Sequence, residues 1–466
     1  MIIEVPPFVQ KILQTVSKAG YEISIVGGVV RDILSRHKQY DWDFTTNAKP
    51  EEILKLFPDG FYDNVFGTVG IPFEGKTYEI TTYRTEFGYS DQRHPDKVSW
   101  GNSLEEDLSR RDFTINAMAI RANNGLAFTF DKSGRTDFEF IDPYNGWEDL
   151  KNKLIRAVRD PNERFDEDAL RMLRGIRFGA QLGFTIEEKT LLAIQNSAPT
   201  IISVSGERIR DEMKKILLSD FPADGILLLH SSNILQYILP ELEKGYQVAQ
   251  AKHHIHDVFT HSVESLRNTP SKKWLVRLAT LLHDVGKPVV AQGEGEDRTF
   301  YNHEVVGTKI AYQIADRWHF SKEDREKFVT LIRWHQFTVD EFQTDKAIRR
   351  FIKRVGNENL EDIFHLRIGD RLGSGCTKAE SWRLKKYMQR TIDVQKHTPS
   401  VKDLKVDGND VMKTLHIKPG PKVGEILNKL FEEILEEPSK NEKELLLKRI
   451  KVLSFSSGRN SSLSES

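Results

Sequence analysis

The sequence contains almost no cysteine and no long apolar run, and both absences limit what the protein can be. Cys376 is the only cysteine among 466 residues, so no disulfide can form within the chain. No apolar stretch approaches the roughly 20 residues of a transmembrane helix. The first residues, MIIEVPPFVQKILQ, lack the basic and apolar regions of a signal peptide. We therefore expect a cytoplasmic protein with no membrane partner.

The chain also lacks an excess of either charge. Its 68 Lys and Arg residues nearly balance 69 Asp and Glu residues, which gives a formal net charge of -1. A nucleic-acid partner would therefore have to be met by locally clustered basic residues, because the overall charge does not attract phosphate. We find no solenoid-type repeat. The length favours about three domains.

The pattern of apolar residues changes along the chain and predicts an α+β protein, with an N-terminal mixed α/β domain followed by all-α domains. In the first part we expect strands at 23–26, 70–72 and 78–82 and helices at 9–19 and 50–57. Later segments, such as 169–178 and 226–239, have long apolar periodicity. A histidine-rich stretch at 252–257 and the sequence Lys396-His397-Thr398-Pro399 mark further boundaries. The expected domains are 1–141, 142–250, 251–396 and 397–453, with a disordered end at 454–466.

A glycine turn and a pair of carboxylates form the first candidate site. The expected strand 23–26 runs into Gly27 and Gly28, and the helix that follows carries Arg31. Such a turn allows close approach of a ligand, and a helix N-terminus offers N–H groups to phosphate. Asp41 and Asp43 are two residues apart, so on a strand both carboxylates would face one side and could hold Mg²⁺. The alternative is a solvated Asp-x-Asp turn.

The expected helix over residues 168–178 carries the second candidate site. Asp168, Arg171, Arg174 and Arg177 recur every three residues and would line one slowly rotating face. Asp168 beside Arg171 places an acceptor next to a donor. Cytosine and adenine present an amino donor beside a ring-nitrogen acceptor, whereas uracil and guanine place a carbonyl where that amino group would be. The pair therefore suits C and A. The alternative is a surface helix with ordinary ion pairs.

Histidines and aspartates spread over residues 256–370 form the third candidate site. His283 and Asp284 follow an apolar segment, Leu278 to Leu282. An imidazole and a carboxylate buried side by side need a compensating charge, which a metal ion supplies.

Three of these segments resemble the motifs of one enzyme family. Residues 27–32 with 41–43 resemble motif A of the class II CCA-adding enzymes and bacterial poly(A) polymerases. Residues 110–117 resemble motif B almost residue for residue, and residues 167–178 resemble motif D. On that strand Trp42 would point away from the two carboxylates, into the core. It is a bulkier spacer than the family's pattern leads us to expect.

The resemblance implies a nucleotidyltransferase head at 1–141 and a helical neck and body at 142–250. It implies template-independent addition of CCA to the 3′ end of tRNA from CTP and ATP. The two catalytic carboxylates, Asp41 and Asp43, would hold Mg²⁺. In the family the residues that match Asp168 and Arg171 recognise the incoming base. The residues expected to bind the nucleotide are Gly28, Arg31, Arg111, Asp168, Arg171, Arg174 and Arg177.

Two further segments carry expectations from the same resemblance. Residues 84–96 match a flexible loop that the family needs to move from C addition to A addition, and its full length favours CCA or A-only addition. Residues 404–411 and 419–427 resemble the tail domain of the same enzymes, so we expect 397–453 to bind tRNA.

The third site resembles the HD superfamily of metal-dependent phosphohydrolases, which defines 251–396 as an HD domain. The matching ligands of a divalent transition metal are His261, His283, Asp284 and Asp370, and His303 and His335 are candidates for a second metal. The resemblance implies a phosphohydrolase activity on RNA ends. A metal-bound but catalytically idle domain is the alternative.

Several functions remain open at this point. Within the family, the alternatives to CCA addition are an A-adding enzyme of a split CC/A system and a poly(A) polymerase. Outside it, they are an HD phosphohydrolase with a non-catalytic RNA-binding half and an RNA-binding protein with a silent site. The sequence leaves the oligomeric state and the substrate of the HD domain open.

Overall fold

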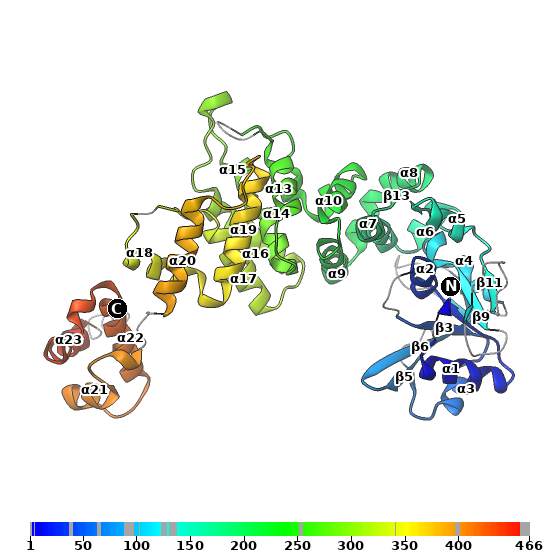
Figure 1. The fold of residues 1–466 in the computed structure, drawn as a ribbon, viewed down its shortest axis with the longest axis horizontal. Coiled ribbons are helices and arrows are strands. Elements are labelled where there is room, and N and C mark those ends of the chain that lie inside the picture. The colour runs from blue at the N-terminus through cyan, green and yellow to red at the C-terminus, as the bar shows by residue number, and fades with distance from the viewer. Residues whose placement is uncertain are drawn as a thin grey trace, which may run out of the picture.

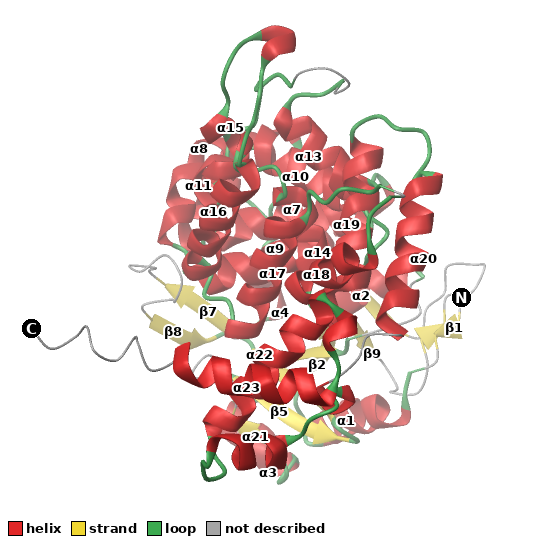
Figure 2. Ribbon diagram, turned by 90° about the vertical axis from the view of Figure 1, so that its left-hand side faces the viewer, coloured by secondary structure: helices red, strands yellow, loops and turns green. Residues whose placement is uncertain are grey.

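The protein is elongated, with its sheet domain at one end and a small helical unit at the other (Figure 1). A computed structural model describes residues 2–3, 5–36, 41–62, 67–87, 97–101, 103–122, 128–129, 138–250, 255–340, 342–396 and 401–456. Helices make up most of the structure and the strands lie in one part of it, as Figure 2 shows. Helices dominate the chain after residue 141, and the expected α+β class is confirmed. None of the helices in these ranges combines the length and apolarity that a bilayer crossing requires.

Seven strands of the described chain form one mixed sheet. Their order is β11 (Phe138–Ile141), β9 (Ala119–Ala122), β2 (Ile23–Val26), β3 (Asp43–Thr46), β6 (Lys76–Thr82), β5 (Thr68–Phe73) and β4 (Phe61–Tyr62). Among these strands β3 and β6 pair in parallel, and they set Asp43 opposite Glu79. The three expected strands are confirmed, because 23–26 is β2 and the other two lie within β5 and β6.

Short helices pack against this sheet, and their apolar spacing explains why they form. In α1 (Pro7–Lys18) the buried residues Val9, Ile12, Leu13 and Val16 recur at helical spacing and make one apolar face. The other elements are α2 (Gly28–Leu34), α3 (Pro50–Leu56), α4 (Leu104–Ser109) and a 3₁₀ turn at Thr114–Asn116. Two-stranded ladders join β1 (Ile2–Ile3) to β10 (Phe128–Thr129) and β7 (Arg84–Phe87) to β8 (Lys97–Trp100).

The prediction that residues 84–96 form a loop was wrong for the first residues of that range. Residues 84–87 form β7, because they pair in register with β8. Residues 88–96 lie outside the described residues.

The middle of the chain is helical, as expected. The elements are α5 (Gly146–Lys151), β12 (Leu154–Ile155), α6 (Pro161–Glu167), α7 (Leu170–Leu182), β13 (Thr185–Ile186), α8 (Glu188–Ser197), α9 (Gly206–Leu217), α10 (Pro222–Ser231), α11 (Leu235–Ile238) and α12 (Pro240–Glu243). The apolar stretch 226–239 is not one helix, because Asn233 adopts a positive φ of 63° and breaks it between α10 and α11.

The third part of the chain is again all helical. It contains α13 (Val258–Arg267), α14 (Trp274–Leu282), α15 (Lys287–Val290), α16 (His303–Arg317), α17 (Lys322–Trp334), α18 (Asp345–Val355), α19 (Leu360–Gly373) and α20 (Trp382–Lys396). Its buried residues belong to one continuous apolar core with the head and the middle helices.

The C-terminal helices have a core of their own. They are α21 (Gly408–Leu415), α22 (Pro421–Glu436) and α23 (Lys443–Ser456), and their buried residues run from Leu404 to Leu453. Disorder was expected from residue 454, but α23 continues to Ser456. Residues 457–466 lie outside the described residues.

Candidate nucleotide and metal sites

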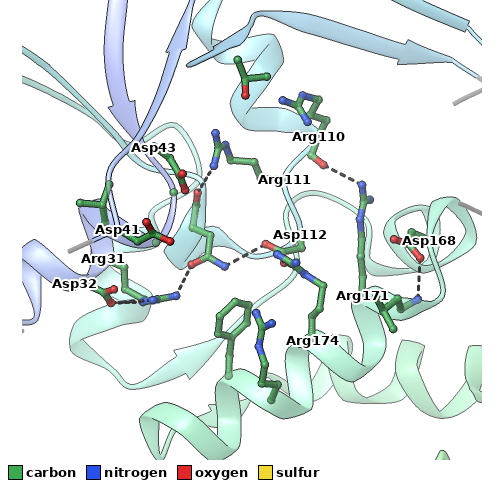
Figure 3. A pocket seen from close by; sticks show the side chains of 18 of the residues that line it. Arg31, Asp32, Asp41, Asp43, Arg110, Arg111, Asp112, Asp168, Arg171 and Arg174 are labelled. Atoms are coloured by element: carbon green, nitrogen blue, oxygen red, sulfur yellow. Dashed lines mark hydrogen bonds and ion pairs between the residues drawn. The ribbon is translucent and has the colours of Figure 1, made fainter. Parts of the chain in front are cut away.

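One cavity of about 570 Å³ gathers every nucleotide-site residue that the sequence predicted. It lies where the ends of the neighbouring strands β2 and β3 face α7. Figure 3 shows side chains that line it. The predicted residues that line it are Gly28, Arg31, Asp41, Asp43, Arg111, Asp168, Arg171, Arg174 and Arg177. Its arginines and aspartates make it strongly polar, which suits a charged ligand such as a nucleoside triphosphate.

The two carboxylates occupy the same side of this cavity, although only one of them is on a strand. Strand β3 begins at Asp43, so the exposed Asp41 lies just before it. Trp42 between them is 7% exposed and packs into the main core, which directs its neighbours away from it. The bulky spacer is therefore a core residue, as expected from its position.

The electrostatics at Asp43 favour binding of a cation. Burial raises the pKa of Asp43 to about 6, attraction to Arg111 opposes this shift, and the nearby carboxylates Asp41 and Glu79 add to it. A divalent cation would offset both the burial of this charge and its repulsion by the neighbouring carboxylates. Carboxylate oxygens are the ligands that Mg²⁺ prefers, so Asp41 and Asp43 fit that ion.

The glycine turn gives an arginine access to the cavity. Gly27 has a φ of +77°, and a Cβ added there would lie 2.8 Å from Nη1 of Arg111. Only glycine combines this backbone conformation with that space. Arg111 is held from behind by Asp107, whose buried Oδ2 lies 3.3 Å from its Nη2. The turn thus leaves room for a positioned guanidinium beside the carboxylate pair.

A chain of hydrogen bonds joins the three segments that carry the motifs. Arg31 donates from Nη1 to Asn116 Oδ1 at 2.8 Å, and Asn116 donates from Nδ2 to Asp112 Oδ1 at 3.2 Å. Arg174 donates from Nε to Asp112 Oδ2 at 2.7 Å. The sequence did not assign a site role to Asp112 or Asn116, although both lie inside the segment that resembles motif B. Their position in that segment was the available signal.

The placement of Asp168 on a helix was wrong. Helix α7 begins at Leu170, and Asp168 has an extended backbone before it. Its Oδ1 accepts a hydrogen bond from the Leu170 N–H at 3.0 Å, which caps the first turn of the helix and explains why an aspartate stands there. Its Oδ2 accepts a hydrogen bond from Arg208 Nη2 at 2.8 Å.

Arg171 also lines the cavity but does not bond to Asp168. It forms an ion pair with Glu167 and donates to the Arg110 carbonyl at 3.2 Å. The Asp168 carboxylate and the Arg171 guanidinium are thus each held by other protein groups. Arg208 could not be identified from the sequence. It lies 40 residues after Asp168, and nothing in its own segment marks it as the partner of that carboxylate.

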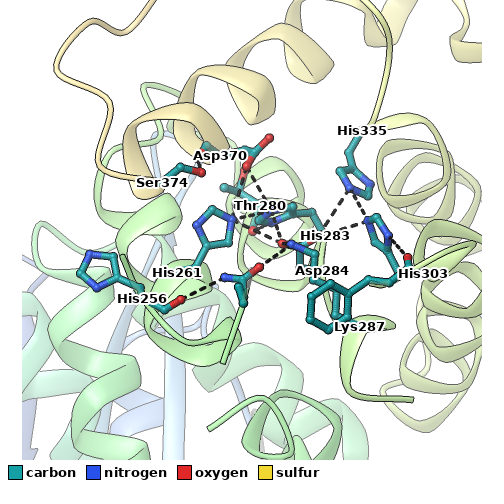
Figure 4. Close-up of polar contacts among 12 residues, drawn as sticks. His256, His261, Thr280, His283, Asp284, Lys287, His303, His335, Asp370 and Ser374 are labelled. Carbon is teal, nitrogen blue, oxygen red and sulfur yellow. Dashed lines mark hydrogen bonds and ion pairs between the residues drawn. The ribbon is translucent and has the colours of Figure 1, made fainter. Parts of the chain in front are cut away.

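The second site collects all six predicted HD residues (Figure 4). They come from α13, the ends of α14 and α17, the start of α16, and α19. Their ligand atoms fall into two sets in which all atoms lie within 4.8 Å of one another: His261, His283 and Asp370, and then Asp284, His303 and His335. The fold therefore brings together predicted ligands that are far apart in the sequence.

Asp284 belongs to the second set and also reaches the first. Its Oδ2 is 3.2 Å from His283 Nε2, and its Oδ1 is 3.3 Å from His303 Nε2. In the first set, Nε2 of His261 is 3.3 Å from Asp370 Oδ1. A carboxylate with one oxygen toward each set could be shared by two metal ions.

Three of the histidines are oriented by backbone carbonyls. Nδ1 of His283, His303 and His335 lies 2.7, 2.9 and 2.7 Å from the carbonyl oxygen three residues earlier. When Nδ1 carries the proton, the Nδ1–H group donates a hydrogen bond to that carbonyl. The Nε2 lone pair is then directed into the site. Burial lowers the pKa of His335 to about 3, so it is neutral and ready to ligate.

His283 behaves differently, because two carboxylates face it. Burial opposes its charge, yet Asp284 and Asp370 together raise its pKa to about 10. The pKa of Asp284 falls well below its usual range despite burial, because His283 and Lys287 lie beside it. The two carboxylates thus favour positive charge at this position, which suits a bound metal cation.

A cavity of about 280 Å³ opens onto this cluster. Lys287 places Nζ 2.6 Å from Asp284 Oδ2, and Arg367 and Arg371 also line the cavity. Cations beside a cluster of side chains that can ligate metal suit a phosphate ester.

Comparison with known proteins matches this arrangement. The Poly A polymerase head domain matches residues 23–156, the HD domain matches residues 251–365, and tRNA nucleotidyltransferase domain 2 matches residues 309–450. The CCA-adding enzyme of Ligilactobacillus salivarius is 34% identical over 443 residues, which cover 95% of each chain. The chain belongs to the CCA-adding enzyme family.

Other members of the family match over different lengths. The CCA-adding enzyme of Limosilactobacillus reuteri is 44% identical over 241 residues, so this alignment spans about half of each chain: 52% of this one and 56% of that relative. The crystal structure of the Bacillus stearothermophilus CCA-adding enzyme in complex with CTP has a TM-score of 0.69 at 26% identity. That match covers 98% of this chain and 100% of the other. The whole architecture, from head to tail, is thus that of a family member.

Proposed function

We propose that this protein adds CCA to the 3′ end of tRNA, using CTP and ATP. The observation that carries the proposal is the cavity in which two carboxylates, the glycine turn and the arginines of three distant segments meet. Its likeness along nearly the whole chain to CCA-adding enzymes supports the choice of reaction. The single cysteine fits action in the reducing cytoplasm, where we place the reaction.

Asp41 and Asp43 are the proposed holders of Mg²⁺, which when bound would lower the pKa of the tRNA 3′-hydroxyl and neutralise charge on the triphosphate. Arg111 stands beside Asp43 and is oriented by Asp107, so it can hold an anionic oxygen of the nucleotide. Arg31 and Arg174 are fixed through Asn116 and Asp112, which lets them meet the nucleotide without losing further conformational freedom.

Base selection falls to Asp168 and Arg171 in this proposal. The carboxylate would accept a hydrogen bond from the amino group of cytosine or adenine, and the guanidinium would donate to the ring nitrogen. Both side chains line the cavity while other protein groups hold them. A fixed donor and acceptor can reject a base that presents the opposite pattern.

The test is extension of tRNA ending at the discriminator base, at C or at CC, with CTP and ATP. Growth of all three is the expected result. Growth only from the CC end would instead assign an A-adding enzyme of a split CC/A system, and untemplated A tracts on other RNAs would assign a poly(A) polymerase. Loss of all extension would leave an RNA-binding half beside an HD phosphohydrolase.

We further propose that the HD domain is a metal-dependent phosphohydrolase that acts on RNA ends. The observation that favours this second activity is the pair of ligand sets joined by Asp284. Histidine-rich ligation suits a divalent transition metal, which would activate water for attack on phosphorus. Lys287 and Arg367 would hold the phosphate oxygens at the mouth of the cavity.

This activity is tested with RNA ending in a 2′,3′-cyclic phosphate and with p-nitrophenyl phosphate, each in the presence of Mn²⁺, Ni²⁺ or Zn²⁺. Metal-dependent hydrolysis that disappears with EDTA is expected. Stoichiometric metal without turnover on either substrate would assign an idle metal domain.

A further inference from the structure

One face of α19 contributes several polar side chains to the cavity of the HD domain. Arg367, Asp370, Arg371 and Ser374 line that cavity, and their spacing of three and four residues places them on one side of the helix and its C-terminal end. Asp370 belongs to the first set of possible metal ligands. The two arginines therefore lie one helical turn apart, beside a cluster that can bind metal.

The first of these arginines, Arg367, is tied to a metal ligand. It donates from Nη1 to Asp370 Oδ2 at 2.8 Å, and its guanidinium lies 5.8 Å from the centroid of the Phe337 ring. The other oxygen of Asp370 lies 3.3 Å from Nε2 of His261. Arg367 is thus held directly beside the ligand cluster, and the carboxylate of Asp370 offsets its charge.

Lys287 is held beside the same cluster by two acceptors. Its Nζ lies 2.6 Å from Asp284 Oδ2 and donates to Gln250 Oε1 at 2.6 Å. The amide of Gln250 is fixed in turn, because its Nε2 donates to the carbonyls of His256 and Asp257. An ammonium group has more N–H donors than these two acceptors use, so a donor remains for a ligand. Lys287 is therefore oriented to meet a phosphate at the metal ligands.

The second arginine, Arg371, has a different partner, which lies in the loop after α19. It donates from Nε to the carbonyl oxygen of Lys378 at 3.0 Å. This bond fixes the plane of the guanidinium and leaves its Nη groups for a ligand. Within the ranges that the structure describes, no carboxylate forms an ion pair with Arg371. Unlike Arg367, it therefore offers the cavity a positive charge that no neighbouring carboxylate offsets.

Two positions for anions in one cavity match the chemistry of an RNA end. Side chains four residues apart on a helix have Cβ atoms about 5–6 Å apart, which is comparable to the separation of successive phosphates along an RNA strand. The cavity of about 280 Å³ is much larger than one phosphate group, so it has room for a ribose as well. The terminal nucleotide of an RNA carries a phosphate on each side of its ribose, whereas a free nucleoside cyclic phosphate carries one.

We propose that Arg371 forms a second phosphate-binding position in the HD cavity. It binds the 5′-phosphate of the terminal nucleotide, while Lys287 and Arg367 hold the phosphate that is hydrolysed. This inference rests on the proposed phosphohydrolase function of the HD domain. In that reaction water adds to the phosphorus of a 2′,3′-cyclic phosphate, one of the two ring P–O bonds breaks, and the departing ribose oxygen takes up a proton. Arg371 takes no part in these steps, and it selects RNA ends by adding affinity.

The test compares two substrates that differ by a single phosphate group: adenosine 2′,3′-cyclic phosphate and the same compound with a 5′-phosphate. Hydrolysis by the whole chain is measured with Mn²⁺, Ni²⁺ or Zn²⁺ to obtain kcat and KM. The wild type should have a KM about tenfold lower for the 5′-phosphorylated substrate, because that substrate gains a charge-assisted hydrogen bond. Arg371→Ala should remove this difference by raising the lower KM about tenfold. It should leave kcat for both substrates and the KM of the other substrate unchanged.

Three further variants separate the roles of the cations. Lys287→Ala should weaken hydrolysis of both substrates by the same factor, because the phosphate that is hydrolysed is common to both. Arg350→Ala removes an exposed arginine of α18 that does not line the cavity, so it is the matched control and should keep the wild-type difference in KM. Arg371→Lys retains the charge and should recover part of that difference. Thermal unfolding of each variant shows whether the fold is intact, and Arg371→Lys keeps the test usable if the alanine variant is unstable.

Binding of the reaction products gives a readout that does not depend on turnover. In isothermal titration calorimetry, Arg371→Ala should weaken binding of adenosine 3′,5′-bisphosphate about tenfold and leave binding of adenosine 3′-phosphate unchanged. Arg371 does not line the nucleotide cavity, so this difference between wild type and variant comes from the HD domain.

The outcomes distinguish this inference from the function on which it rests. Equal KM values for the two substrates in the wild type, or an unchanged difference in Arg371→Ala, would overturn the second phosphate position and leave the phosphohydrolase function standing. If the wild type hydrolyses neither substrate with any of the three metals, the proposed phosphohydrolase function itself fails. Calorimetry then still decides whether Arg371 binds the 5′-phosphate.

Discussion

Asp112 and Arg174 join two distant segments of the chain at the floor of the nucleotide cavity. The carboxylate Oδ2 lies 2.7 Å from both Nε and Nη2 of the guanidinium, although 62 residues separate them. Burial acts against the charge on Asp112, but Arg174 and a hydrogen bond from Asn116 outweigh it and lower its pKa to about 2. The pair thus links the two segments and holds in place an arginine that lines the cavity.

We expect Asp112→Asn to lower the free energy of unfolding by about 1–3 kcal/mol, because a buried charged partner is lost. The wild-type contribution should be present above the usual aspartate pKa and disappear as pH falls toward about 2, since the folded-state pKa is depressed. Urea unfolding at pH 7 and pH 3 measures both effects. Glu148→Gln, at an exposed pair, is the control. Equal stability of Asp112→Asn and the wild type at pH 7 would contradict the prediction.

We expect Asp41→Asn or Asp43→Asn to reduce nucleotide addition by roughly a hundredfold or more, because an amide ligates Mg²⁺ poorly. Binding of tRNA should remain nearly intact, since the two carboxylates lie in the nucleotide cavity. Single-turnover addition and a filter-binding assay measure the two properties. Asp59→Asn, at an exposed position, is the matched control. A variant that retains near-wild-type turnover would remove the pair from the mechanism.

The pKa of Asp43 predicts a specific competition between protons and Mg²⁺. Burial and neighbouring carboxylates raise this pKa to about 6, so a proton should compete with Mg²⁺ for this carboxylate as pH falls through that value. At low Mg²⁺ the rate should fall by about tenfold per pH unit below 6. Saturating Mg²⁺ should shift the midpoint to lower pH. A midpoint that does not move with Mg²⁺ concentration would show that another group controls the profile.

The sequence predicted the parts of this fold and site that depend on local pattern. The strand 23–26, the burial of Trp42 and the gathering of nine residues in one cavity all followed from apolar spacing and motif resemblance. It failed at Asp168, because a single side-chain hydrogen bond to Leu170 starts the helix two residues later than periodicity suggests. It could not find Arg208, whose role depends on where α9 packs and on no pattern within its own segment.

We expect the HD site to work independently of nucleotide addition. His283→Ala or Asp284→Ala should lose bound transition metal and phosphohydrolase activity, because each removes a ligand from the cluster. Addition of CCA should persist, since the described residues that line the nucleotide cavity all precede this domain. Metal content by mass spectrometry and both activity assays test this. His319→Asn, at an exposed histidine with a positive φ, is the control. Loss of both activities in a folded variant would show one shared mechanism.

The base specificity of the cavity gives the most discriminating prediction. The wild-type protein should use CTP and ATP and reject UTP and GTP. UTP would set its O4 carbonyl against the Asp168 carboxylate and its N3–H against the Arg171 guanidinium. Each mismatch replaces a charge-assisted hydrogen bond and costs about 1–3 kcal/mol, which corresponds to roughly tenfold or more in discrimination.

Asp168→Ala removes both the attraction for C and A and the repulsion of U. The rate with CTP should therefore fall, and the CTP-over-UTP ratio should shrink by about tenfold or more. Single-nucleotide incorporation with each of the four triphosphates measures this. Asp166→Ala, at the exposed aspartate two residues earlier, is the matched control and should keep the full preference. If Asp168→Ala loses rate but retains its preference for CTP, the base is recognised elsewhere, and Asp168 serves only to cap α7.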